Sequence, residues 1–156
     1  MLMDNLIKLD KLSWKERGLL AQSLVLLPLI HIALILLGYA RLRRVIEVLT
    51  PLQPEPRGRS VTESFSHACE VARIVSIAAE HGVYRATCLR KSMLLWWFLR
   101  RDGIPSRICF GVRMTHHLLE AHAWVEWDGI VLNDSIHVSD GYKALQDGLP
   151  ATSMGL

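Results

Sequence analysis

Residues 87–101 read TCLRKSMLLWWFLRR and residues 121–136 read AHAWVEWDGIVLNDSI, and these two stretches decide the fold. The first carries apolar side chains nearly all the way round a helix, a pattern typical of a central helix that other elements cover on most sides. Thr87 is a suitable N-cap, so the helix is expected to begin at the next residue. The second stretch alternates like strands and contains Asp128-Gly129, a strong hairpin signal.

The elements around these two stretches fix the order of the chain. Residues 62–80 place apolar side chains at helical spacing, and Gly82 ends that pattern. Three later segments have the alternating, β-rich pattern of strands: residues 107–113, 121–127 and 130–136. Helices that precede an antiparallel sheet predict an α+β fold.

The N-terminal part contains a long apolar run. Residues 19–38 carry no formal charge and are about as long as a bilayer is thick. Ser13 and Glu16 have the spacing of a capping box, so a helix is expected to begin at Trp14, and Pro28 predicts a kink or a break in it. Basic residues flank the run on both sides and give no orientation signal for membrane insertion. We expect a helical pair buried against the rest of the protein or against a partner, with a membrane-associated helix as the alternative.

A proline-rich stretch separates this part from the remainder. Residues 50–60, TPLQPEPRGRS, hold three prolines and one glycine and cannot continue a helix. The chain is therefore expected to have an N-terminal apolar helical segment (residues 1–50), a linker (51–60) and one compact domain (61–156).

Composition excludes several classes of protein. Of the 156 residues, 51% are apolar and 21% are charged, which excludes intrinsic disorder. A net charge of +3 is too mild to indicate nucleic acid as a partner. The chain has three cysteines, which is an odd number, and no CxxC pair, so a disulfide framework is not expected. We therefore expect a reducing, cytoplasmic location.

Cys88 is the most informative residue for chemistry. It is expected in the first turn of the central helix, where unpaired backbone N–H groups and the helix dipole favour a negative charge. A thiolate is stabilised there, and the thiolate is the nucleophilic form of cysteine. A buried structural cysteine is the other interpretation of this residue.

His122 and Asp134 are expected to meet across the hairpin. A two-residue turn at residues 128–129 would place Asp134 opposite Ala123, on the wrong face of the sheet. A three-residue loop, residues 127–129, ends in the glycine that its left-handed last position favours, and it pairs His122 with Asp134. We therefore predict the three-residue loop, with the carboxylate orienting the imidazole. A satisfied core histidine is the alternative.

No metal or cofactor is expected. His116 and His117 could suggest zinc together with Cys109 or His137, but adjacent histidines on a strand point to opposite faces. Asn133 adjoins Asp134, yet strict alternation along a strand predicts that its side chain faces away from the site.

Three motifs together resemble one family of enzymes. Residues 87–92 (TCLRKS), 100–107 (RRDGIPSR) and 120–126 (EAHAWVE) are similar to the lasso peptide leader peptidases, which belong to the transglutaminase-like superfamily of papain-type cysteine enzymes. The resemblance covers residues 60–135, and the N-terminal stretch is similar to the family's helical lead-in by composition. It implies a papain- or transglutaminase-like core, in which a helix bearing the cysteine precedes an antiparallel sheet bearing the histidine and the aspartate.

The resemblance also implies roles and partners. The family's nucleophile falls on Cys88, its base on His122 and its orienting acid on Asp134. The substrate would be a ribosomal precursor peptide, cut between leader and core to free an α-amine for a separate lasso cyclase. The residues before position 60 look like apolar helices and not like a leader-recognition domain, so the chain resembles the split form, which takes its substrate from a separate leader-recognition protein.

Two other functions stay open at this stage. The same residues would serve acyl transfer to an amine, as in transglutaminases, because only the acceptor differs. A non-catalytic, membrane-associated scaffold could retain the fold, with peripheral membrane contact through residues 19–37. Loss of a triad residue would favour the scaffold, and all three residues are present.

Overall fold

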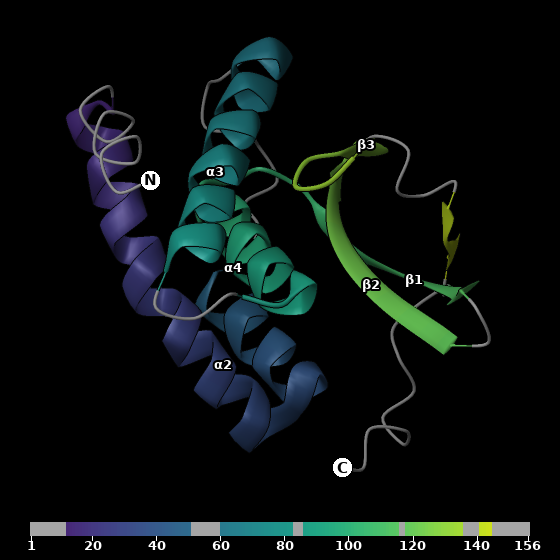
Figure 1. Cartoon of the computed structure of the whole chain (residues 1–156). Coiled ribbons are helices and arrows are strands. Elements are labelled where there is room, and N and C mark those ends of the chain that lie inside the picture. The colour runs from purple at the N-terminus through teal and green to yellow at the C-terminus, as the bar shows by residue number, and fades with distance from the viewer. Residues whose placement is uncertain (1–11, 51–59, 83–85, 116–117, 136–140, 145–156) are drawn as a thin grey trace.

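The computed structural model describes residues 12–50, 60–82, 86–115, 118–135 and 141–144 (Figure 1). Its elements, in chain order, are α2 (Trp14–Leu49), α3 (Val61–His81), α4 (Cys88–Arg101), β1 (Arg107–Thr115), β2 (Leu118–Trp127), β3 (Ile130–Val131) and β4 (Lys143–Ala144). Helices precede an antiparallel sheet, which confirms the predicted α+β class. The structure is consistent with a transglutaminase-like fold that carries an N-terminal helix.

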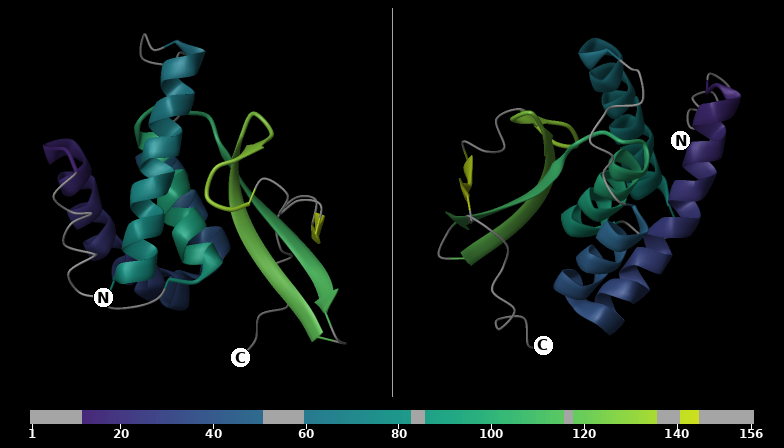
Figure 2. Two further views of the ribbon diagram at one scale, coloured as in Figure 1. Left: turned by 45° about the horizontal axis from the view of Figure 1, so that its top comes forward. Right: turned by 180° about the vertical axis from the view of Figure 1, so that it is seen from behind.

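Helix α4 is the centre of the molecule, as its sequence predicts. It lies between the sheet on one side and helices α2 and α3 on the other (Figures 1 and 2). The sheet has the order β3-β2-β1-β4. The core combines buried apolar side chains of α3 and α4 with Val125 of β2, which is fully buried.

Helix α2 leaves helical backbone geometry at Gly38 and not at Pro28, so a break at Pro28 is wrong. Gly38 has φ +74°, a left-handed conformation that glycine adopts without a steric penalty, and both flanks of it are helical. Pro28 lies within the first half, where it costs the helix one hydrogen bond but does not end it. Beyond Gly38 the second half turns back toward α4 (Figure 1).

Among the described residues, protein covers one side of α2. Five of its apolar side chains are buried in the common core: Leu20, Leu27, Ile30, Leu42 and Ile46. Seven other apolar side chains of α2 are exposed, and we call them the outward face: Leu24, Val25, Leu29, Ile32, Ile35, Leu36 and Leu37. The helix is long and apolar enough to cross a bilayer, and only 22% of its most apolar stretch is buried.

The β2–β3 hairpin differs from the prediction in its turn and in its length. Trp127 pairs with Ile130, so the loop has two residues and the predicted three-residue loop is wrong. Asp128 (φ +48°) and Gly129 (φ +79°) are both left-handed, as in a type I′ turn, whose twist matches that of the flanking strands. The strand predicted over residues 130–136 is too long: β3 covers Ile130–Val131, Leu132 keeps one backbone bond to Val125, and residues 133–135 leave the ladder, while residue 136 lies outside the described part.

Candidate active site

His122 and Asp134 meet even though the hairpin register is not the predicted one. Nε2 of His122 lies 2.6 Å from Oδ2 of Asp134. With a two-residue turn, Asp134 would oppose Ala123 if β3 continued. Because the chain leaves the sheet after Val131, the Asp134 side chain is free of strand alternation and reaches the imidazole.

This contact fixes which ring nitrogen is available for proton transfer. A carboxylate only accepts hydrogen bonds, so Nε2–H of His122 donates to Asp134 and Nδ1 is the nitrogen left to accept a proton. Burial raises the pKa of Asp134, but the hydrogen bonds from His122 and from the Ser135 N–H, with the charge of Lys91, outweigh it and lower that pKa below its usual value. Asp134 is therefore ionised at neutral pH.

Two aromatic rings hold the imidazole in place. The ring of Tyr142 stacks on His122 with centroids 5.2 Å apart, and that of Trp124 lies at 6.2 Å. Gly111 pairs with His122 across the β1–β2 ladder. A Cβ atom at Gly111 would lie 2.6 Å from Cβ of Tyr142 and 3.0 Å from the Trp124 ring, so this position needs glycine.

The sequence reasoning missed Tyr142 and Gly111. Tyr142 comes from the far end of the chain, and no local pattern links it to His122. A signal for Gly111 was present, because a glycine inside a strand often marks the close approach of another group.

Cys88 is the first residue of α4, as predicted. Its thiol is free and partly buried, and the N-cap residue Thr87 forms no capping hydrogen bond with its side chain. The first turn contains no acidic residue. Arg90 and Lys91 add positive charge there. This helix start offers backbone donors and a positive field, the surroundings that stabilise a thiolate or an oxyanion.

Cys88 and His122 lie on elements that are joined close to both residues. The hydroxyl of Ser92, one helical turn after Cys88, donates to the carbonyl of Ala123, next to His122, over 3.0 Å. No hydrogen bond joins Sγ of Cys88 to His122 in the described part of the chain.

The other two cysteines are less suited to nucleophilic chemistry. Burial, followed by the nearby charge of Glu126, raises the pKa of Cys109 to about 11, so it stays a thiol at neutral pH. Cys69 is exposed on α3, away from any helix start. It lines a polar cleft of about 390 Å³ that also includes Lys91 and Asp134.

A metal site is not evident where the structure can be described. Over those residues no three His, Cys, Asp or Glu side chains gather as metal ligands would. His116, His117 and His137 lie outside the described residues. The expectation that the protein needs no metal therefore stays a prediction.

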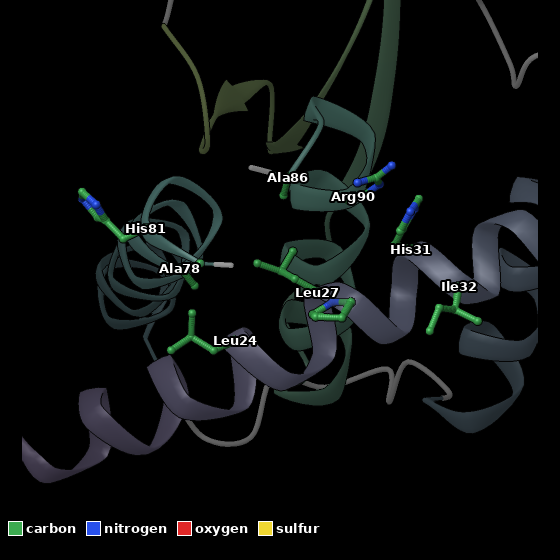
Figure 3. Close-up of a pocket in the computed structure, with 10 residues that line it drawn as sticks. Leu24, Leu27, His31, Ile32, Ala78, His81, Ala86 and Arg90 are labelled. Carbon is green, nitrogen blue, oxygen red and sulfur yellow. The ribbon is translucent and has the colours of Figure 1, made fainter. Parts of the chain in front are cut away.

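An apolar cavity of about 370 Å³ lies between α2, the end of α3 and the first turn of α4 (Figure 3). Leu24, Leu27 and Ala78 line it with apolar surface, and the nitrogen-bearing ends of His31 and Arg90 lie near one another at one end (Figure 3). Arg90 follows Cys88 by two positions, so on a helix the two side chains point to roughly opposite faces. The cavity is therefore behind the thiol and not beside it.

Comparison with known proteins gives one match. A sequence model of the Transglutaminase-like superfamily matches residues 25–147, which include Cys88, His122 and Asp134. No curated protein and no solved structure matches the chain. The matched region begins inside α2, so part of the N-terminal helix belongs to it.

Proposed function

This chain belongs to the transglutaminase-like superfamily, and within that superfamily we propose that it is a cysteine peptidase that removes the leader from a ribosomally made lasso peptide precursor. The superfamily includes cysteine peptidases and acyltransferases. The observation that carries the proposal is the His122–Asp134 pair, whose histidine lies on β2, the strand that Ser92 joins to the first turns of the helix that begins, without a side-chain cap, at Cys88. The motifs around these residues support the choice of substrate.

In the first half of the reaction, Sγ of Cys88 attacks the carbonyl carbon of the scissile bond while the thiol proton passes to Nδ1 of His122. The developing oxyanion accepts a hydrogen bond from the backbone N–H of Cys88, which the helix dipole strengthens. The C–N bond then breaks, and Nδ1 returns its proton to the departing amine. The core peptide leaves with a free α-amine, and the leader stays on Cys88 as a thioester.

In the second half, water attacks the thioester carbon and gives a proton to Nδ1 of His122. Collapse of this intermediate breaks the C–S bond and releases the leader carboxylic acid, while Nδ1 of His122 returns its proton to Sγ and restores the thiol of Cys88. Asp134 holds Nε2–H throughout, so Nδ1 faces the reaction in the form that accepts a proton.

The partners belong to the same proposal. The precursor peptide is presented by a separate leader-recognition protein, the released amine is used by a lasso cyclase, and all of them act in the cytoplasm. We place the recognition protein on the outward face of α2, since an apolar area of this extent on a soluble protein is usually an interaction site. The adjoining cavity, with Arg90 and His31 at one end, suits an apolar segment that carries a carboxylate.

The docking site is tested by binding of the recognition protein to variants of the outward face. Val25→Glu and Leu29→Glu should abolish co-purification, whereas Lys15→Glu, on the exposed start of the same helix, should retain it. Flotation with liposomes provides the second measurement. If wild-type protein floats with liposomes and does not bind the recognition protein, α2 contacts a membrane surface instead. That result would contradict this docking site.

The chemistry is tested by incubation with precursor and recognition protein in H₂¹⁸O, followed by mass spectrometry. Hydrolysis predicts a leader fragment with ¹⁸O in its new carboxyl group and a core with a free amine. Cys88→Ala should give no fragment, and Cys109→Ala should cleave like wild type. A leader amide formed with an added amine would favour acyl transfer. Cleavage that survives in Cys88→Ala would contradict the proposal, and a folded wild-type protein that gives no fragment would favour a non-catalytic scaffold.

A further inference from the structure

We propose that Ser92 and Asn133 are positioning residues that replace a missing length of strand at the edge of β2. In this role they hold the start of α4 and the Asp134 segment against the strand that carries His122. The catalytic meaning of this pair rests on the proposed function; the hydrogen bonds that define it do not.

The edge of β2 is open where β3 ends. The backbone ladder stops with the Leu132 N–H, which donates to the Val125 carbonyl over 3.0 Å. The next donor along the edge, the Val125 N–H, is bonded by the Asn133 side chain, whose Oδ1 accepts over 2.8 Å. An amide side chain thus does what the carbonyl of a longer strand would do.

Ser92 continues the same edge. Its hydroxyl donates to the Ala123 carbonyl and accepts from Nδ2 of Asn133, both over 3.0 Å. Ser92 is fully buried, and Asn133 is 6% exposed. Water therefore cannot take over these bonds, and loss of one member leaves buried polar groups without partners.

Each group of the proposed triad is close in sequence to one end of this network. Cys88 is one helical turn before Ser92, His122 precedes Ala123, and Asp134 follows Asn133. Three elements that carry the nucleophile, the base and the acid thus meet through two side chains. A displacement of about 1 Å among reacting groups can cost on the order of a hundredfold in rate, so this junction controls reactivity as well as stability.

Strand alternation, on which the prediction that Asn133 faces away from the site rests, does not apply here, because its side chain bonds to the edge of β2 and to Ser92. Alternation applies only while a residue belongs to a strand, and β3 ends at Val131. The Asn133 side chain points back to β2 because it supplies the acceptor that the strand no longer provides.

The chain offers a matched control for a test. Ser23 is also fully buried, but its hydroxyl donates to the Leu19 carbonyl within its own helix, over 2.8 Å. Ser92→Ala and Ser23→Ala remove the same atom from equally buried sites. The measurement is the rate of Cys88 alkylation by iodoacetamide from pH 6 to 9, read by peptide mass spectrometry, with the urea midpoint as a measure of stability.

In Ser92→Ala we expect the rate of Cys88 alkylation at pH 6 to fall by on the order of a hundredfold. The pH dependence of that rate should then match the pH dependence of an isolated thiol. Ser23→Ala should keep the wild-type pH profile even where its urea midpoint falls. A wild-type profile in Ser92→Ala would overturn the positioning role and leave the triad intact. A wild-type protein whose Cys88 itself behaves as an isolated thiol would contradict the proposed function.

Hydrogen exchange at the Val125 amide tests the hydrogen-bond network of Ser92 and Asn133 by a measurement that does not depend on Cys88. Exchange should accelerate at least tenfold in Asn133→Leu, which keeps the side-chain volume but lacks the acceptor, and not in Ser23→Ala. Unchanged exchange in Asn133→Leu would overturn the assignment of Asn133, whatever Cys88 does.

Discussion

The starts of α3 and α4 are built in opposite ways. At α3, the Ser60 hydroxyl accepts from the Glu63 N–H over 3.2 Å, and the Glu63 carboxylate accepts from the Ser60 N–H over 2.8 Å. At α4, the Thr87 side chain makes no capping bond, and the first turn has no acidic residue. A capping box satisfies orphan donors permanently, whereas the start of α4 leaves donors beside Cys88 available.

The start of α3 is built for stability, whereas the start of α4 is built for reactivity. A good N-cap contributes about 1 kcal/mol to a helix, and α2 has a capping box as well, formed by Ser13 and Glu16. The helix that carries Cys88 lacks this stabilisation at the one position where a negative charge is proposed to form.

The largest effect is expected at the thiol itself. Cys88→Ala should reduce leader cleavage by on the order of 10⁴ or more, because the nucleophile is gone, while the urea midpoint stays close to that of wild type. Mass spectrometry of cleavage and urea unfolding of the same sample provide both values. An unfolded Cys88→Ala protein would assign the residue to packing instead.

A smaller loss is expected when the base is disoriented. Asp134→Asn should retain measurable cleavage, reduced by roughly 10²–10⁴, because the imidazole stays in place without a fixed tautomer. Steady-state rates should show the loss in kcat more than in KM. A variant as active as wild type would remove Asp134 from the mechanism.

The same carboxylate has an effect on stability in acid. The pKa of Asp134 is lowered in the folded protein, so its contribution to stability is complete above the unfolded value of about 4 and disappears as the pH falls through the folded value. Urea midpoints of wild type and Asp134→Asn should therefore converge between about pH 5 and pH 2. A difference that stays constant over that range would contradict the pairing with His122.

Arg90→Glu would convert the start of α4 into one like that of α3. Residue 90 is three positions after Thr87, so the substitution creates the Thr-x-x-Glu pattern of a capping box. We expect the protein to gain about 0.5–1 kcal/mol and Cys88 to lose roughly tenfold in alkylation rate at pH 6. Arg90→Ala, which removes the charge without supplying a cap, is the control and should not gain stability. Equal or faster alkylation in Arg90→Glu would show that the open helix start has no part in the reactivity.

The smallest effect is expected on the free energy of unfolding when each of the two cap residues is replaced by alanine. Ser60→Ala should cost about 1 kcal/mol, because it removes a cap bond that α3 uses. Thr87→Ala should cost only a few tenths, since the Thr87 hydroxyl makes no such bond. Urea unfolding of both variants gives the comparison, and equal costs would mean that Thr87 caps α4 in solution.

Local sequence patterns predicted the elements whose formation depends on local interactions. Residues 88–101 form the expected helix because Thr87 is a suitable cap and the apolar pattern is strong. The break in α2 was misplaced because proline is the more obvious signal, whereas Gly38 has the left-handed φ that lets the helix turn.

The candidate site was predicted through a wrong intermediate step. Asp134 was expected beside His122 through a three-residue loop, but the type I′ turn and the early end of β3 bring them together instead. The roles of Ser92 and Asn133 could not be predicted from periodicity, because both side chains act across elements at a sheet edge that no local pattern describes.

On the proposed function, the open start of α4 and the His122–Asp134 pair together activate Cys88. Alkylation of the three cysteines within one molecule tests this activation most directly, with iodoacetamide at pH 6 and each site quantified by peptide mass spectrometry. We expect Cys88 to react at least tenfold faster than the exposed Cys69, and Cys109 hardly to react because burial raises its pKa to about 11. We also expect His122→Ala to remove the advantage of Cys88. Cys88 reacting no faster than Cys69, or keeping its advantage in His122→Ala, would contradict it.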